Sequence, residues 1–199
     1  IGDSITDIKT AENAGIDCFS KKAFASVTMD EIARSANLSK RTIYNHYPSK
    51  ATLIASIFES KLEELYNLEL RSMQSCTNAS EVLQTLFSTL NRFTLENINF
   101  MKMFWSLGDE INLEEVAQEE MFRIKRWNQR LVEMPAGFIR KMQLTGILAK
   151  FSPELIVHYV SAINKGLVLQ NNKSKNLDLI GFNLQELTEL SQLVFINSM

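Results

Sequence analysis

Apolar residues recur every three or four positions along most of this chain, which is the spacing of an amphipathic α-helix. The pattern is longest after residue 50, where leucine, isoleucine, valine and phenylalanine form one stripe after another. Three prolines and seven glycines in 199 residues leave room for long uninterrupted helices rather than a sheet-rich fold. The sequence therefore predicts an all-α protein.

Breaks in the stripes divide the second part of the chain. The polar composition of residues 72–80 and 171–182 predicts loops there. Ser49, Ser152 and Asn183 have the side chains that cap helix N-termini, and either Asn78 or Ser80 can cap the helix after the first loop. The predicted helices cover 49–73, 80–95, 96–107 (ended by Gly108 and Asp109), 112–133 (ending before Pro135), 135–150, 153–168 and 184–194.

The segment from Thr28 to Lys50 is shorter and more specific. Thr28 precedes Glu31 by three residues, which is the spacing of a capping box. Asn37 suits the left-handed backbone of a sharp turn, and Ser39 can cap the helix that follows. Pro48 ends this second helix because the residue before a proline is pushed out of the helical region. Two short helices joined by a tight turn are predicted.

The second short helix has the chemistry of an anion-binding surface. The chain carries a net charge of −2, yet residues 32–50 contain four basic residues and no acidic one. Ile43 and Tyr47, four residues apart, are expected to pack inward. A docked recognition helix directs its N-terminal residues to base edges, while hydroxyls and cations hold phosphates. The predicted base contacts are Lys40, Arg41 and Asn45, and the other predicted DNA contacts are Thr28, Ser39, Thr42, Tyr44, His46 and Lys50.

The run FSKKAF-x(3)-TMDEIARSANLSKRTIYNHYPSK, residues 19–50, resembles the DNA-binding domain of the TetR family of bacterial one-component repressors. The resemblance implies a three-helix helix-turn-helix domain, placed here at residues 1–50. It also implies a larger helical ligand-binding and dimerisation domain at 51–199. A homodimer would bind a palindromic operator and leave it when a small hydrophobic effector binds.

Some positions depart from the family pattern. Ala23 and Asn37 replace glycines that are usual after the first helix and in the inter-helix turn. Arg41 replaces a residue that is often small, which adds a long side chain to the recognition helix. Gly15 lies inside the predicted first helix, where it costs about 1 kcal/mol relative to alanine.

The middle of the second domain is rich in methionine and aromatic residues. Such side chains line pockets for apolar molecules, although they also serve as ordinary core. The family context favours a pocket, and Asn97, Asn99, Asp109 and His158 are polar groups that could orient a ligand. The predicted pocket residues are Phe93, Phe100, Met103, Phe104, Trp105, Phe122, Trp127, Phe138 and Met142.

The last two predicted helices carry broad apolar stripes. In the family, the corresponding helices of two subunits form a four-helix bundle. Completion of the monomer core is the alternative, but a single recognition helix gives little affinity for DNA, so we favour a dimer. The predicted interface residues are Leu155, Tyr159, Ile163, Leu167, Leu187, Leu190 and Val194.

Other classes of protein find little support. His46 and His158 are the two histidines of the chain, which is too few to build a catalytic triad with a partner set or a metal cluster, so no enzyme activity, cofactor or metal is expected.

Cys18 and Cys76 form no disulfide framework, and Cys18 is expected to be buried. The absence of a signal sequence and of a long apolar run predicts a cytoplasmic location and no membrane partner. An activator or a protein-binding module of the same fold remains the alternative function.

Overall fold

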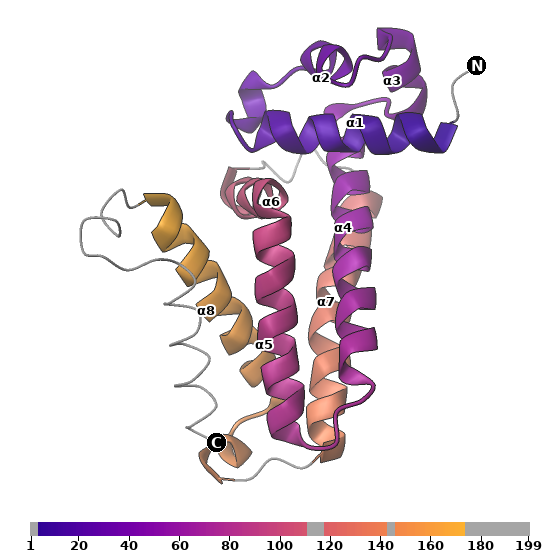
Figure 1. The fold of residues 1–199 in the computed structure, drawn as a ribbon. Helices are drawn as coiled ribbons and strands as arrows, with labels where there is room; N and C mark the ends of the chain where they lie inside the picture. The colour runs from indigo at the N-terminus through magenta and orange to yellow at the C-terminus, as the bar shows by residue number, and fades with distance from the viewer. Residues whose placement is uncertain (1–3, 111–117, 143–145, 174–199) are drawn as a thin grey trace. The chain divides into compact units, whose positions relative to one another are not determined.

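A computed structural model describes residues 4–110, 118–142 and 146–173, and in this part of the chain the regular structure is entirely helical (Figure 1). The predicted all-α fold is confirmed. The helices are α1 (Ser4–Phe19), the 3-10 turn η1 (Phe24–Ser26), α2 (Met29–Ser35), α3 (Lys40–His46), α4 (Lys50–Met73), α5 (Ala79–Glu96), α6 (Ile98–Glu110), α7 (Gln118–Met142), the 3-10 turn η3 (Gly146–Lys150) and α8 (Pro153–Lys173).

The chain folds into two compact units. The first combines residues 1–63 with 96–128, and the second combines 64–95 with 129–199. This division differs from the predicted boundary after residue 50, because the start of α4, all of α6 and the start of α7 belong to the first unit. Helices α4 and α7 each contribute to both units. The functional division into 1–50 and 51–199 stays a prediction.

The first three helices pack around a small apolar core. Phe19 of α1, Ile32 of α2 and Ile43 of α3 are almost completely buried. Gly15 lies where α1 approaches α4 closely: a Cβ atom at this position would come within 2.9 Å of Ile57 Cδ1 and 3.3 Å of Leu53 Cδ2. The close approach explains why a helix interior tolerates the conformational cost of glycine here.

Side-chain caps begin the next helices where the sequence predicts. The Thr52 amide donates to Ser49 Oγ at 3.1 Å ahead of α4. At α5 the cap is Asn78, whose Oδ1 accepts from the Glu81 amide at 2.9 Å. The Glu81 carboxylate accepts in return from the Thr77 amide at 2.7 Å, which lowers the pKa of Glu81. This reciprocal pairing fixes the start of α5 and decides between Asn78 and Ser80.

Two predicted helix ends are wrong. Helix α6 continues through Gly108 and Asp109 to Glu110. Helix α7 runs uninterrupted past Pro135, although proline removes one backbone hydrogen bond and costs about 3 kcal/mol in a helix interior. Ala136 and Ile139 beside it are fully buried, so tertiary packing offsets the local cost. The predicted helix 135–150 is instead the end of α7 followed by η3.

Helix α8 begins as predicted, with the Leu155 amide donating to Ser152 Oγ at 3.2 Å and Pro153 in the first position. It extends to Lys173 and so includes the first three residues of the segment predicted as a loop, 171–182. The helix predicted from Asn183 lies outside the described residues. Among the helices that the structure describes, none is long and apolar enough to cross a membrane.

Candidate nucleic-acid interface

Local capping builds the α2–turn–α3 segment. Thr28 Oγ1 accepts from the Glu31 amide at 3.2 Å, and Ser39 Oγ accepts from the Thr42 amide at 3.0 Å. Asn37 has a φ of 54° and is the only non-glycine residue with positive φ in the part of the chain that the structure describes. The predicted turn is confirmed, and asparagine substitutes there for the usual glycine. Ala23 has φ −57° and ψ 146°, so its position makes no demand for glycine.

Helix α3 has one buried face and one open face. Ile43 and Tyr47 are buried, as predicted, and fix the helix against the rest of the domain. The side chains predicted to contact DNA lie on the remaining surface. Thr28, Ser39, Lys40, Arg41, Tyr44 and Asn45 are exposed, whereas Thr42, His46 and Lys50 are half-buried.

Acidic residues of α2 hold two of the nearby cations. Lys40 forms an ion pair with Asp30, and Lys22 Nζ lies 2.5 Å from Glu31 Oε1. The hydrogen bond from Lys22 lowers the pKa of Glu31. Arg41 has no acidic partner among the described residues, so its guanidinium is available to an external anion. The Lys40 pair is exposed and is therefore worth little, so a phosphate or base could take over its ammonium.

Lys50 is placed differently from the other predicted contacts. Its Nζ donates to the carbonyl oxygens of Phe24 at 2.6 Å and Val27 at 2.9 Å, and it lies 4.0 Å from the centroid of the Phe24 ring. These contacts tie the start of α4 to the η1 turn. We therefore assign Lys50 a structural role and leave it out of the proposed DNA contacts.

A buried carboxylate positions the end of α3. Ser56 of α4 donates to Glu12 Oε1 at 2.7 Å, and the Tyr47 hydroxyl donates to the same oxygen at 3.4 Å. Burial raises the pKa of Tyr47 to about 12, so the phenol stays protonated and remains a donor. The network connects α1, α3 and α4 at one point. In the sequence, the one sign of this network is a single acid, Glu12, between the apolar residues Ala11 and Ile16 of α1.

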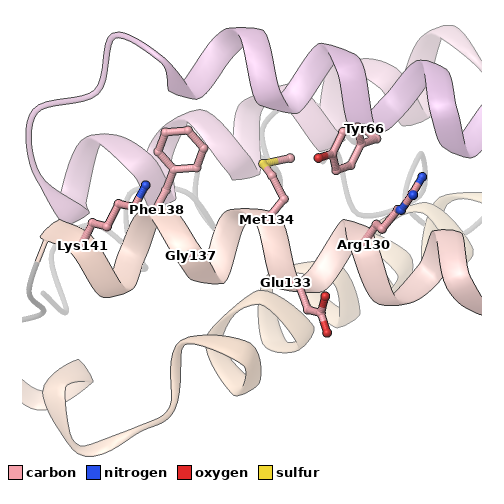
Figure 2. Close-up of a pocket in the computed structure, with 7 residues that line it drawn as sticks. All are labelled: Tyr66, Arg130, Glu133, Met134, Gly137, Phe138 and Lys141. Atoms are coloured by element: carbon pink, nitrogen blue, oxygen red, sulfur yellow. The ribbon is translucent and has the colours of Figure 1, made fainter.

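Among the described residues, two of the hollows lie outside the α2–turn–α3 segment. One, of about 350 Å³, lies between α4 and α7 in the second unit; Met134 and Phe138 point toward α4 there, and Glu133 points away (Figure 2). Its lining consists of Tyr66, Arg130, Glu133, Met134, Gly137, Phe138 and Lys141. The other, of about 280 Å³, lies in the first unit between α1, α4 and the start of α6. Asn97 and Asn99, considered from the sequence as ligand-orienting groups, line it.

The predicted pocket residues do not gather around either hollow. Phe138 lines the first and Phe100 lines the second. Phe93, Met103 and Trp105 are buried core, whereas Phe122 is 66% exposed. Phe100 and Phe104 pack with Phe58 at ring-centroid distances of 6.1 and 5.2 Å, which is core packing in the first unit. Trp127 and Met142 are half-buried.

His158, considered from the sequence as a ligand-orienting group, is exposed. Sequence reasoning also missed Glu69, a carboxylate buried in the second unit. The burial of Glu69 could have been predicted from its position in the helical pattern. Leu62, Leu65 and Met73 mark the buried stripe of α4, and Glu69 lies on the same stripe.

Cys18 is buried as expected, and burial raises the pKa of its thiol.

Two capped helices around a left-handed turn, with an open basic face on the second, define a helix-turn-helix regulator. Residues 13–57 match the family described as bacterial regulatory proteins of the tetR family. IcaR of Staphylococcus aureus, the negative transcriptional regulator of the biofilm operon icaADBC, is 28% identical over 131 residues, which cover 65% of this chain and 67% of the relative. Residues 13–57 therefore form a domain of the tetR-family type, and the chain is similar to a negative transcriptional regulator over 65% of its length.

Solved structures share the fold over nearly the full length. FadR from Bacillus subtilis, in complex with stearoyl-CoA, superposes with a TM-score of 0.71 at 13% identity, covering 96% of this chain and 98% of that one. A transcriptional regulator from Saccharomonospora viridis, in complex with choline, gives 0.70 at 16% identity, covering 96% and 95%. At these identities the likeness establishes the helical fold and nothing about ligands.

Proposed function

We propose that this protein is a ligand-responsive repressor that binds a palindromic operator as a homodimer. The observation that carries the proposal is the open face of α3, where Lys40, Arg41 and Asn45 are exposed while Ile43 is buried. Arginine favours guanine and asparagine favours adenine in the major groove. Thr28, Ser39 and the neighbouring polar side chains of α3 would hold phosphates and set the register.

Support for a dimer comes from α8. Leu155 and Tyr159, one turn apart, are 53% and 56% exposed, while Ile156, Val157 and Val160 on the same helix are buried. The helix therefore has an outer apolar strip in addition to the face that completes the core. Ile163 is half-buried, the side chain of Leu167 is outside the described set, and Leu187, Leu190 and Val194 lie outside the described residues.

The release step would act through α4. This helix begins at the cap beside the DNA-binding segment and continues into the second unit, so a ligand bound in the second unit could change its tilt. Ligand binding shifts the population only if the ligand prefers the state that cannot bind DNA. The solved relatives contain stearoyl-CoA in one case and choline in another, so the fold accepts different ligands.

Selection from a random pool of duplex DNA tests the proposal. The purified protein should enrich a palindrome with two half-sites about one helical turn apart. Weak, salt-sensitive retention without any enriched sequence would contradict sequence-specific binding. Transcription from the enriched operator, with and without the protein, then separates a repressor from an activator.

A further inference from the structure

Glu69 is an acid in an apolar interior. It is 2% exposed and lies on α4 between Leu65 and Met73, both of which are buried on the same stripe. Its Oε2 atom is inaccessible to solvent and has no hydrogen-bond partner among the described residues. Glu69 is therefore the most isolated acid in the part of the chain that the structure describes.

This isolation is costly. Burial alone raises the pKa of Glu69 to about 8, and no nearby charge contributes to the shift. A buried acid without a partner costs stability, and an apolar side chain of similar size is usually neutral or better. Folding therefore gives no reason for an acid at this position, whereas binding a charged group does.

A second buried polar group in the same unit can be satisfied by its neighbours. Asn164 of α8 lies 2.9 Å from the Thr94 hydroxyl, and that hydroxyl also donates to the Leu90 carbonyl oxygen at 2.8 Å. Because the hydroxyl has one proton, the Asn164 amide nitrogen can donate to it once the amide is turned end for end. The Glu69 oxygen, by contrast, has no hydrogen-bond partner among the described residues.

Resting on the proposed function, we infer that the effector is a hydrophobic cation that binds in the interior of the second unit, with its charged group paired to Glu69. Apart from Thr89, Thr94 and Asn164, the other buried side chains among the described residues of this unit are apolar and suit the body of such a molecule. They include Leu83, Leu86, Phe87, Leu90, Phe93, Ala136 and Ile139. Hydrophobic amines and quaternary ammonium compounds have the required combination of charge and apolar surface.

Binding would move one proton. At neutral pH the buried acid holds its proton, and a cation would stabilise the carboxylate instead. The O–H bond of Glu69 then breaks, the proton leaves to solvent, and the oxygen pairs with the cation of the ligand. Proton release on binding is therefore a signature that a purely structural glutamate would not give.

The groove in Figure 2 has the opposite preference. Arg130 and Lys141 lie toward its two ends, so it suits an anion rather than a cation. An anionic probe consequently distinguishes binding in this groove from binding at Glu69. The choice of probe charge thus becomes the central variable of the test.

The test compares three probes that share one aromatic body: 1-naphthylmethylamine, 1-naphthylmethanol and 1-naphthoate. Their dissociation constants are measured by titration calorimetry at pH 7 on the full chain, Glu69→Gln and Glu63→Gln. Glu63 is an exposed acid of the same helix and serves as the control. The amine should bind the wild type and Glu63→Gln at least about tenfold more tightly than the alcohol, as expected for a charge-assisted contact. In Glu69→Gln this preference should fall to about one.

Titration of the amine in phosphate and in Tris buffer should show release of about one proton from the wild type and none from Glu69→Gln. Glu69→Leu is a second variant that separates loss of the acid from loss of the fold. It should stay folded, because leucine suits the apolar interior, and it should also bind the amine no more tightly than the alcohol. Equal binding of amine and alcohol by the wild type would overturn the inference, as would an amine preference that survives in Glu69→Gln. Tightest binding of the naphthoate would overturn it in favour of the groove.

DNA selection on the same preparation tests the proposed function separately from the inference about the effector. A protein that enriches a palindrome but has no preference for the amine retains the proposed function and overturns the inference about the effector. A protein that prefers the amine through Glu69 but enriches no DNA sequence supports the cation site and contradicts the proposed function.

Discussion

The hydroxyl of Tyr47, at the end of α3, lies 3.4 Å from Oε1 of Glu12 in the middle of α1. The same oxygen accepts the stronger bond from Ser56 at 2.7 Å. One acceptor in α1 thus sets the end of α3 relative to the start of α4. Because the carboxylate is buried, its removal leaves two donors without an acceptor.

Glu12→Ala should lower the free energy of unfolding by about 1–3 kcal/mol, the usual cost of leaving buried donors unpaired. Tyr47→Phe should cost less, about 0.5–1.5 kcal/mol, since it removes one longer bond. Urea unfolding followed by circular dichroism measures both. Tyr44→Phe is the matched control, because Tyr44 is exposed, and it should change stability by less than about 0.5 kcal/mol. Equal effects of the two tyrosine variants would contradict the role of the network.

Lys50→Met should destabilise the protein by about 1–3 kcal/mol, because two carbonyl oxygens lose a charged donor. It should leave the salt dependence of DNA binding unchanged, since the ammonium is held by Phe24 and Val27. The measurements are thermal unfolding and operator affinity between low and high salt. Lys21→Met, at an exposed position, is the stability control. A salt slope reduced by about one unit in Lys50→Met would instead identify a phosphate contact.

Arg41→Ala should weaken operator binding by about 1–3 kcal/mol per half-site if the guanidinium reads a base. The loss should be confined to the selected operator and should be smaller for scrambled DNA. Fluorescence anisotropy with both duplexes measures the two affinities. Arg34→Ala, an exposed arginine of α2, is the matched control. Equal losses on operator and scrambled DNA would show that Arg41 contacts the backbone.

The elements with local signals were predictable. Caps at Thr28, Ser39 and Ser152 and the turn residue Asn37 act within a few residues, so their effects can be read from the sequence. Pro135 shows the limit: the local cost of proline predicts a helix end, but packing around it keeps α7 continuous.

The candidate site shows the same division. Exposure of Arg41 follows from the burial of Ile43 and the helical period, so the open face of α3 was predictable. The positions of Lys50 and Glu69 depend on which residues distant in sequence surround them. Lys50, which the sequence predicts as a DNA contact, instead donates to a backbone carbonyl oxygen of η1. Glu69, on the apolar stripe of α4, is buried, and its Oε2 atom has no hydrogen-bond partner among the described residues.

Glu69 should make stability fall as the pH rises. Folding raises its pKa from 4.5 to about 8, so between these values the folded state retains a proton that the unfolded state has lost. The contribution is fully present below pH 4.5 and is lost as the pH rises through 8, with a slope of up to about 1.4 kcal/mol per pH unit. Urea unfolding of the wild type and Glu69→Gln from pH 5 to 9 measures the difference. If the free energy of unfolding depended on pH in the same way in the wild type and Glu69→Gln, the raised pKa of Glu69 would be contradicted. The control variant Glu63→Gln should follow the wild type.

Leu155→Glu should dissociate the proposed dimer, because it places a charge on the apolar strip that Leu155 and Tyr159 leave exposed on α8. Burying an unpaired charge in an interface costs several kcal/mol, enough to move a micromolar dimer to monomer at ordinary concentrations. Sedimentation equilibrium measures the change, and operator affinity should fall with it because each half-site then binds alone. Ser161→Glu, at an exposed position farther round the same helix, is the matched control and should leave the dimer intact. A monomeric wild type, or a Leu155→Glu variant that stays dimeric, would show that this strip is not the interface.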